Sequence, residues 1–395
     1  MASPKASITH LVPPGRRLET VLSIVAKHAD DVDRNARFPQ EAFDALKRER
    51  LLGILIPRDL GGEGTSLGEI VEMCAVLAQH CASTAMIFAM HHIKVSSLVT
   101  HGATDSWHRS FMKEIVESQL LLGSATTEAG IGGDLRNSIC AVETNDGHFE
   151  LTKQASVISY ATRCDAILAT ARRHRDAAGS DQVMVVLKKD QYTLTKTADW
   201  DTLGMRGTCS EGFVLQGRAP AEQIFPHPFA EIAAQSMLAM SHLMWAGVWF
   251  GIAADAVQRT QGYLRGEARK RPGTTPPGAV GLAAAVAQLQ ALKGAVLAGV
   301  AQYDAGIRDP NILSGIGFSV AMNNVKVTAS TSASAIVHAC LTISGISAYR
   351  NESKFSLCRH MRDVLSAAIM INNDRILGNT ANLLLVSKAD TRLAV

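Results

Sequence analysis

The feature that most restricts the fold of this sequence is a series of four long helical segments toward its C-terminal end. Alanine, leucine and valine dominate these segments, and only short polar connections such as RKRPGTTPPG and RDPN separate them. Long helices joined by short connections are typical of a bundle, because each helix can bury its apolar face only against its neighbours. The segments lie near residues 231–266, 279–306, 311–343 and 357–388. We therefore predict a C-terminal four-helix bundle over residues 229–395.

The first 120 residues also have the pattern of helices. Apolar residues recur with the 3.6-residue period between residues 21 and 32, and Pro39 marks the start of a second helix. Ser66 is followed three residues later by Glu69, which is the pattern of a capping box at the start of a helix. We predict an N-terminal α-helical domain over residues 1–120.

The pattern changes near Leu121, where short β-prone runs begin to recur about every 8–12 residues. The sequence Asn145-Asp146-Gly147 supplies a hairpin turn between the first two runs. These features predict a middle β-barrel domain over residues 121–228, and an α+β multidomain protein as a whole. The runs cover residues 139–143, 149–152, 157–159, 166–171, 183–187, 192–197 and 213–216.

Composition excludes several classes of function. A formal net charge of +3 and an aromatic content of 5% argue against a nucleic-acid partner. The seven cysteines contain no C-x-x-C pair, which argues against a disulfide framework or a metal site and favours a cytoplasmic protein. The first 17 residues lack the apolar run of a signal peptide. Polar residues within the apolar runs 237–257 and 279–301 favour buried helices over membrane spans, so no membrane partner is expected.

A glycine-rich loop, TTEAGIGGD, extends from Thr126 to Asp134 and follows an apolar run. A glycine-rich turn at the end of a strand allows the backbone to approach a ligand closely. The loop is not a dinucleotide-binding G-x-G-x-x-G motif, because Leu135 occupies the position of the last glycine, and no G-K-[ST] follows. Taken alone, the loop is compatible both with a ligand site and with an ordinary turn.

Four other segments, together with this loop, resemble the acyl-CoA dehydrogenase superfamily in the correct order. FPQEAFDALKRERLLGILIPRDLGG (38–62) is similar to the N-terminal helical signature, and TTEAGIGGD resembles the family's TEPGAGSD loop. ASVISYATRCDAILATARR (155–173) follows at the distance of the K-x-W-I-[ST]-N…AD strand. LGMRGTCSEGFVLQGRAPAEQIF (203–225) resembles LGMRGS…F…VRVPAENV, and RHMRDVLSAAIMINND (359–374) stands where the family has RDA…IYEGT.

The resemblance implies that the glycine loop lies against the isoalloxazine ring of FAD. The Thr127 hydroxyl and the backbone at Gly132 and Gly133 would meet the ring edge, although Gly133 replaces a serine and so loses one side-chain hydrogen bond. Ser159 matches a strand hydroxyl that meets the flavin, and Val157 replaces a tryptophan that covers one face of the ring.

The resemblance also assigns residues to the remainder of the cofactor. Arg265 or Arg269 would replace the arginine that reaches the pyrophosphate of a neighbouring subunit, although a solvated charge cluster at a helix end is an equally good interpretation. Gly345 is retained in LTISGIS, where the family has QIFGGNG, and Asn373 is assigned to the same cofactor site. Because a neighbouring bundle completes the flavin site in the family, a homotetramer is expected.

The catalytic base of the family is missing. Dehydrogenation of an acyl thioester requires a carboxylate beside the α-carbon. In most of the family this is the glutamate of YEGT, a position that falls on Ile371, and a minority place it at the position of Ser241. Asp374, one helical turn beyond Ile371, is the candidate for a displaced base, although a solvent-facing aspartate is an alternative interpretation. Glu128 of the glycine loop is structural in the family.

Three functions therefore stay open. The first, with a narrow lead, is an FAD-dependent oxidoreductase that oxidises an acyl thioester of CoA or a carrier protein at Cα–Cβ and passes electrons to an acceptor. The second is a flavin-dependent monooxygenase of the same fold, served by a flavin reductase, which needs a protected cavity instead of a base. His91, His92 and His360 are its candidate histidines, while the pattern R-x-H-x-L-H-D is absent. The third is a flavin-binding protein without this chemistry.

Overall fold

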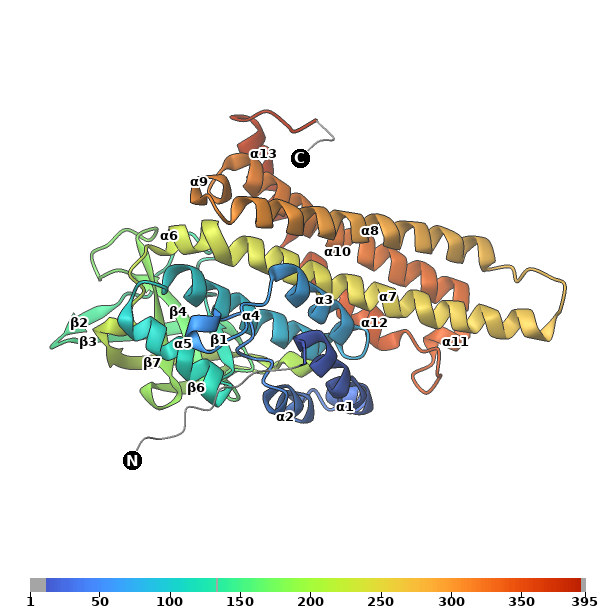
Figure 1. Ribbon diagram of the computed structural model, residues 1–395, viewed down its shortest axis with the longest axis horizontal. Coiled ribbons are helices and arrows are strands. Elements are labelled where there is room, and N and C mark those ends of the chain that lie inside the picture. The colour runs from blue at the N-terminus through green and yellow to red at the C-terminus, as the bar shows by residue number, and fades with distance from the viewer. Residues whose placement is uncertain (1–11, 133, 392–395) are drawn as a thin grey trace.

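The computed structural model describes residues 12–132 and 134–391. Residues 1–11, which carry most of the stretch predicted to lack a signal peptide, lie outside this range, and so does Gly133 of the glycine loop. Along the described chain, a group of helices precedes a region of β-strands, and long helices follow (Figure 1). The α+β fold class predicted from the sequence, with helical regions on both sides of a middle sheet region, is confirmed.

The described part of the N-terminal region, from residue 12 onward, contains five α-helices. Helix α3 begins at the predicted capping box: the Ser66 hydroxyl accepts a hydrogen bond from the Glu69 amide at 3.3 Å, and the Glu69 carboxylate accepts one from the Ser66 amide at 3.0 Å. Helix α4 is buried along most of its length and ends at Gly102, so it forms the centre of this region. The helices are α1 (Pro14–Arg34), α2 (Gln40–Arg48), α3 (Leu67–Ala78), α4 (Ala82–His101) and α5 (Ser106–Ser118).

The middle region consists of two sheets. One has three strands in the order β1-β4-β5, with β1 and β4 parallel, and the other is antiparallel with the order β2-β3-β7-β6. The predicted turn joins β2 to β3, with positive φ angles of 47° at Asp146 and 73° at Gly147. The strands are β1 (Leu122–Ala125), β2 (Glu143–Asn145), β3 (His148–Ser159), β4 (Ala166–Arg172), β5 (Gln182–Lys188), β6 (Tyr192–Ala198) and β7 (Ser210–Pro220).

Two local features of this region differ from a simple sheet. The predicted strand at 139–143 forms only in part: Ala141 makes an isolated parallel bridge with Arg172 at the end of β4 and Glu143 begins β2, whereas the backbone amides of Ile139 and Cys140 donate to the Glu128 carboxylate. The pairing of β3 with β7 is irregular between Ala155 and Ile158, where Val157 lies. Bulges of this kind bend a strand and redirect its side chains. The irregularity therefore lies where the resemblance placed the flavin.

Three long helices form most of the C-terminal region, and Figure 1 shows them running side by side. They are α7 (Leu238–Lys270), α8 (Ala279–Gly306) and α10 (Ile316–Ser344). Helix α7 continues from α6 (Phe229–Ile232) through a π-helical turn, Ala233–Met237. Such turns are rare and frequently lie at functional sites. Two single-turn helices, α9 (Pro310–Leu313) and α11 (Ile346–Tyr349), complete the connections.

The fourth predicted segment, 357–388, is not one continuous helix. It is divided into α12 (Cys358–Val364), a 3₁₀ turn (Leu365–Ala368) and α13 (Asn373–Leu384). The ammonium of Lys326 on α10 donates to the carbonyl oxygens of Ala367 at 3.0 Å and Ile371 at 2.6 Å. Ile371 adopts a positive φ of 51°, which a helix cannot contain. The buried lysine thus satisfies the carbonyl groups that the interruption leaves free.

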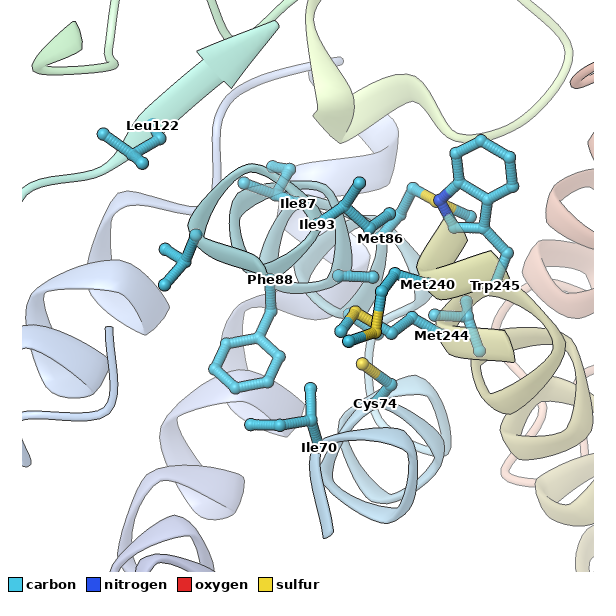
Figure 2. Packing of buried hydrophobic residues seen from close by; sticks show 14 of the residues in the cluster. Ile70, Cys74, Met86, Ile87, Phe88, Ile93, Leu122, Met240, Met244 and Trp245 are labelled. Atoms are coloured by element: carbon cyan, nitrogen blue, oxygen red, sulfur yellow. The ribbon is translucent and has the colours of Figure 1, made fainter. Parts of the chain in front are cut away.

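Helix α7 packs against α3 at very short range. A Cβ atom added to Gly251 would come within 2.1 Å of the Ala75 carbonyl oxygen, so only glycine permits this approach. Figure 2 shows side chains from α3, α4 and α7 meeting in one apolar cluster, among them Cys74, Phe88 and Met244. Cys74 is fully buried in this cluster.

Within the part of the chain that the structure describes, three helical stretches are long and apolar enough to cross a membrane by length and composition: 229–270, 279–306 and 316–344. The most apolar part of the stretch 229–270 is 89% buried inside the chain, as expected for a buried helix. The corresponding windows of 279–306 and 316–344 are only 22% and 39% buried. Helices α8 and α10 therefore present apolar surface that this chain alone does not cover.

Candidate functional site

A cavity of about 500 Å³ lies where the three regions of the chain meet. Its walls come from α4, the glycine loop, strands β3 and β7, the start of α7 and the interrupted segment 369–372. This volume falls within the range of about 300–1,000 Å³ that is usual for small-molecule sites. Most of the lining is apolar, and α4, the π-helical turn and α7 contribute Met86, Met90, Ile93, Met237 and Trp245.

The structure brings together six of the residues that the sequence singled out: Thr127, Gly132, Val157, Ser159, Ser241 and Ile371. They come from four separate segments of the chain, and all of them line the cavity. Gly133, the loop position where the family has serine, lies outside the described residues. The cavity is thus the place at which the motifs of the family converge.

Hydroxyl groups form one edge of the cavity. The Thr127 hydroxyl donates to the Val157 carbonyl at 2.9 Å, which ties the glycine loop to β3 and leaves the hydroxyl oxygen free to accept a hydrogen bond. The Ser159 and Ser210 hydroxyls lie 2.8 Å apart, and the Thr208 hydroxyl lies 2.8 Å from that of Ser210. Ser210 and Thr208 were missed by the sequence analysis, because Ser210 meets Ser159 only through the pairing of β3 with β7.

Glu128 holds the glycine loop in place from behind the cavity. Its carboxylate accepts hydrogen bonds from the Cys140 amide at 2.6 Å, the Ser138 hydroxyl at 2.7 Å and the Lys153 ammonium at 3.0 Å. Burial by itself would raise the pKa of Glu128, but the Lys153 charge and these hydrogen bonds outweigh it and hold the pKa below its usual range. Glu128 is therefore an ionised structural group and does not line the cavity.

No aspartate or glutamate is found among the described residues that line the cavity. The candidate base Asp374 has an exposed side chain in the first turn of α13, where its amide donates to the Asn372 side chain at 2.7 Å. The structure therefore does not place Asp374 in the site. Ile371 and Ser241 do line the cavity, and the Ser241 hydroxyl donates to the Met237 carbonyl at 2.6 Å.

One buried carboxyl group lies close to the site without entering it. Asp363, in the RHMRD segment, accepts a hydrogen bond from the Met205 amide at 2.6 Å, and Met205 lines the cavity. Burial raises the pKa of Asp363 to about 6. Its observed contact fixes the loop before β7 against α12, which is a positioning role.

The three candidate histidines do not line the cavity. Nε2 of His91 lies 2.7 Å from the Leu52 carbonyl oxygen, and its Nδ1 accepts a hydrogen bond from the Leu122 amide. His92 and His360 are also buried and hydrogen-bonded, His360 to Asp255 at 2.6 Å. Burial lowers the pKa of His91 to about 4, so it is neutral at pH 7. These histidines connect elements of the fold.

The remaining predicted cofactor residues lie away from this cavity. Arg269 is at the end of α7, roughly 40 Å along the helix from Ser241 at 1.5 Å per residue. Gly345 follows α10 with a positive φ of 54°. Asn373 lies beside the cavity but is bound to Lys326 and Ser330 instead of lining it. Within a single chain, these positions do not form one site with Thr127.

Lys94 was also missed by the sequence analysis. It lies on α4, lines the cavity, and its side chain is only 4% exposed. Among the described residues its ammonium has a single hydrogen-bond partner, the sulfur of Met237 at 3.3 Å, and burial lowers its pKa to about 7. The signal in the sequence was a lone lysine inside the apolar helix AMIFAMHHIKVSS, and no motif assigns a role to that position.

Comparisons with known proteins agree with this architecture. The family model for the acyl-CoA dehydrogenase N-terminal domain matches residues 19–119, and that for the C-terminal domain matches residues 232–379. L-evernosamine nitrososynthase from Micromonospora sp. is 28% identical over 380 residues, covering 91% of this chain and 87% of that protein. Amino sugar nitrososynthase DnmZ from Streptomyces peucetius is 26% identical over 374 residues, covering 91% and 90%.

A solved structure extends the likeness to the fold. FMN-bound TdsC, a dibenzothiophene monooxygenase from Paenibacillus sp. A11-2, superimposes with a TM-score of 0.80 at 19% identity, covering 95% of this chain and 98% of that one. The two family models together span more than half of the chain. Ile371 and Ser241, the two positions to which the resemblance assigns the usual base, both line the cavity, and neither is acidic. The chain therefore belongs to the acyl-CoA dehydrogenase superfamily of flavoenzymes, as an atypical member that lacks the family's usual catalytic glutamate.

Proposed function

We propose that this protein is a reduced-flavin-dependent monooxygenase that oxygenates a small organic molecule in the cavity. The observation that carries the proposal is the lack of any carboxylate among the described residues that line the cavity. Removal of an α-proton needs a base within hydrogen-bond reach of the substrate. Oxygenation needs a site that excludes water, and the apolar walls from α4 and α7 provide one. We thus prefer monooxygenation to acyl-thioester oxidation, which is the reaction that the sequence motifs favoured.

The comparisons support the same function. The nitrososynthases and the dibenzothiophene monooxygenase each match more than nine-tenths of this chain. We propose that the oxygenated atom is a nitrogen, a sulfur or an aromatic carbon.

A flavin ring fits the residues of the cavity. Its apolar walls suit the flat ring, while the Thr127 hydroxyl, the Ser159 hydroxyl and the backbone of the glycine loop provide polar partners at one edge. We propose FMN in preference to FAD, because TdsC binds FMN and because Arg269 and Gly345 lie away from the cavity. The reduced flavin supplies the electrons that activate dioxygen. A separate flavin reductase is the expected partner.

The residues of the chain then have separate tasks. Thr127 and Ser159 orient the ring edge, and Glu128 with Lys153 keeps the loop that carries Thr127 rigid. The side chain of Ile371 occupies the place of a base and keeps that wall of the cavity apolar. Together these groups bind the flavin and exclude water from the space above it.

The proposal is tested by comparing two reactions of the same protein reconstituted with FMN and, in parallel, with FAD. We expect FMN to be retained, and acyl-CoA substrates from butyryl to palmitoyl to leave the flavin absorbance unchanged without oxygen. With a flavin reductase and isotopically labelled dioxygen, we expect labelled oxygen in at least one probe among indole, dibenzothiophene and a nucleotide-linked amino sugar.

Two variants sharpen this experiment. Thr127→Val should weaken flavin retention, because the ring edge loses a hydroxyl partner worth about 1–3 kcal/mol. Ile371→Glu returns a carboxylate to the position used by most relatives, and a gain of acyl-CoA-dependent flavin reduction in this variant alone would agree with the proposal. Reduction of the flavin by acyl-CoA in the unmodified protein would contradict it and identify a dehydrogenase.

We further propose that the chain assembles into a homo-oligomer, with a tetramer as the expected form. The supporting observation is the uncovered apolar surface of α8, where Val280 is 80% exposed and Leu297 is 57% exposed. Surfaces of this kind usually mark contacts between proteins. Light scattering should give a multiple of the mass of one chain, and Leu297→Glu should lower that mass. A single-chain mass at micromolar concentration would refute the proposal.

A further inference from the structure

Three lysines among the described residues have buried side chains, and two of them are fully satisfied. Lys153 forms an ion pair with Glu128 at 3.0 Å and donates to the Thr170 carbonyl at 2.8 Å. Lys326 donates to two carbonyl oxygens and to the Asn373 side chain at 2.7 Å. Both follow the rule that a buried charge requires partners, because its removal from water is costly.

Lys94 is the exception. Lys94 is 4% exposed, and its one hydrogen bond to a described residue is with the Met237 sulfur at 3.3 Å, which is a weak acceptor. No salt bridge to Lys94 is present within the described ranges 12–132 and 134–391. Burial is the single cause that lowers its pKa to about 7, so no neighbouring charge compensates it. An ammonium placed in this way lacks a strong acceptor that the protein itself could supply.

The position of Lys94 indicates where that acceptor comes from. Lys94 lines the cavity from α4, next to Met237 at the end of the π-helical turn. The groups that fit the flavin edge, Thr127 and Ser159, come from the glycine loop and β3, which are different walls. Apart from Arg375, which donates to the Gly132 carbonyl, Lys94 is the one lysine or arginine among the described lining residues. The described residues that line the cavity therefore combine mostly apolar side chains with two basic ones and include no carboxylate.

We propose that Lys94 forms an anion-binding subsite, and that the substrate is a largely apolar molecule carrying a carboxylate, sulfonate or phosphate group that this lysine binds. The inference rests on the proposed function, since it takes the cavity to hold a substrate beside the flavin. An anionic group would supply the missing acceptor through a charge-assisted hydrogen bond. The thioether and aromatic side chains of Met86, Met90 and Trp245 would contact the apolar part.

The test compares two fluorescent probes with the same aromatic skeleton on the FMN-loaded protein. Anilinonaphthalene sulfonate is anionic, and N-phenylnaphthylamine is neutral. In Lys94→Met, which keeps an unbranched apolar side chain only one atom shorter, we expect binding of the sulfonate to weaken about tenfold or more, because a hydrogen bond to a charged group is lost. Binding of the neutral probe should stay within about twofold. Lys113→Met, at an exposed position on α5, is the matched control and should change neither.

Three outcomes would overturn the proposal. The first is unchanged sulfonate binding in Lys94→Met, and the second is an equal loss for both probes, which would indicate a change in the shape of the cavity. The third is loss of FMN with sulfonate binding retained, which would assign Lys94 to the flavin. The assay does not depend on oxygen. If labelled dioxygen enters no probe while the Lys94-dependent difference is observed, the proposed function fails and the anion subsite stands.

Discussion

Glu128→Ala is expected to lower the free energy of unfolding by about 3–5 kcal/mol, because it leaves the Lys153 ammonium buried without its counter-charge. Lys153 is fully buried and would retain only the Thr170 carbonyl as a partner. The backbone amides of Ile139 and Cys140 would lose their acceptor as well. We also expect weaker flavin retention, because the loop that carries Thr127 loses the group that anchors it.

Urea unfolding of four variants measures this effect. In the double variant Glu128→Ala/Lys153→Met, the decrease in the free energy of unfolding should be smaller than the sum of the decreases in the two single variants, because both charges are removed together. Asp181→Ala removes an exposed ion pair with Arg173 at 3.1 Å and should cost about 1 kcal/mol or less. If Glu128→Ala lowers the free energy of unfolding by less than about 1 kcal/mol, the prediction is contradicted, and water or another group must replace the carboxylate.

The Glu128 carboxylate also makes the stability of the folded protein depend on pH. The folded-state pKa of Glu128 lies below its value in the unfolded chain. Its contribution is therefore fully present above the unfolded pKa and is lost as the pH falls through the folded pKa. Acid titration of the unfolding free energy should accordingly show a smaller decrease in Glu128→Ala than in the unmodified protein.

Lys326→Met is expected to destabilise the segment 369–372 and abolish flavin retention. The substitution leaves the carbonyl oxygens of Ala367 and Ile371 and the Asn373 side chain without their shared donor. An unsatisfied buried acceptor costs about 1–3 kcal/mol, so the total loss should reach about 3 kcal/mol or more. Because Ile369, Met370 and Ile371 line the cavity, their release should open it to water.

Hydrogen exchange separates this local effect from general destabilisation. The amides of Ile376 and Met370, which donate to the Asn372 and Ser366 carbonyls, should exchange faster in Lys326→Met. Amides of α4 should keep their protection at the same time. Lys113→Met serves as the exposed control and should behave like the unmodified protein. Unchanged exchange in the segment 369–372 would mean that its shape does not depend on the lysine.

Local sequence patterns were sufficient for most of the secondary structure. The Ser66–Glu69 capping box, the Asn145-Asp146-Gly147 turn and the start of α2 after Pro39 all appear where they were predicted. These features depend on residues that are neighbours along the chain, so their physics is contained in a short stretch of sequence. The fold class followed from their order.

The motifs of the family also located one wall of the site. Thr127, Val157 and Ser159 line a single cavity, as the resemblance implied. Ile371 and Ser241, to which the resemblance assigns the two positions of the usual base, line the same cavity. The motifs did not identify which other side chains lie near Ile371 and Ser241 in the folded chain. Asp374 was the nearest acid in sequence, yet its side chain is exposed.

The sequence by itself therefore determined the order of the helices and strands, the fold class and the residues of the glycine loop. Only the tertiary structure decided that the fourth helix is interrupted, that Ser210 faces Ser159, and that Lys94 is left without a strong partner in the cavity. The physical reason is the same in each case. The partner of a buried polar group is supplied by a segment distant in sequence, as Lys326 is for the Ile371 carbonyl, and no local pattern records that contact.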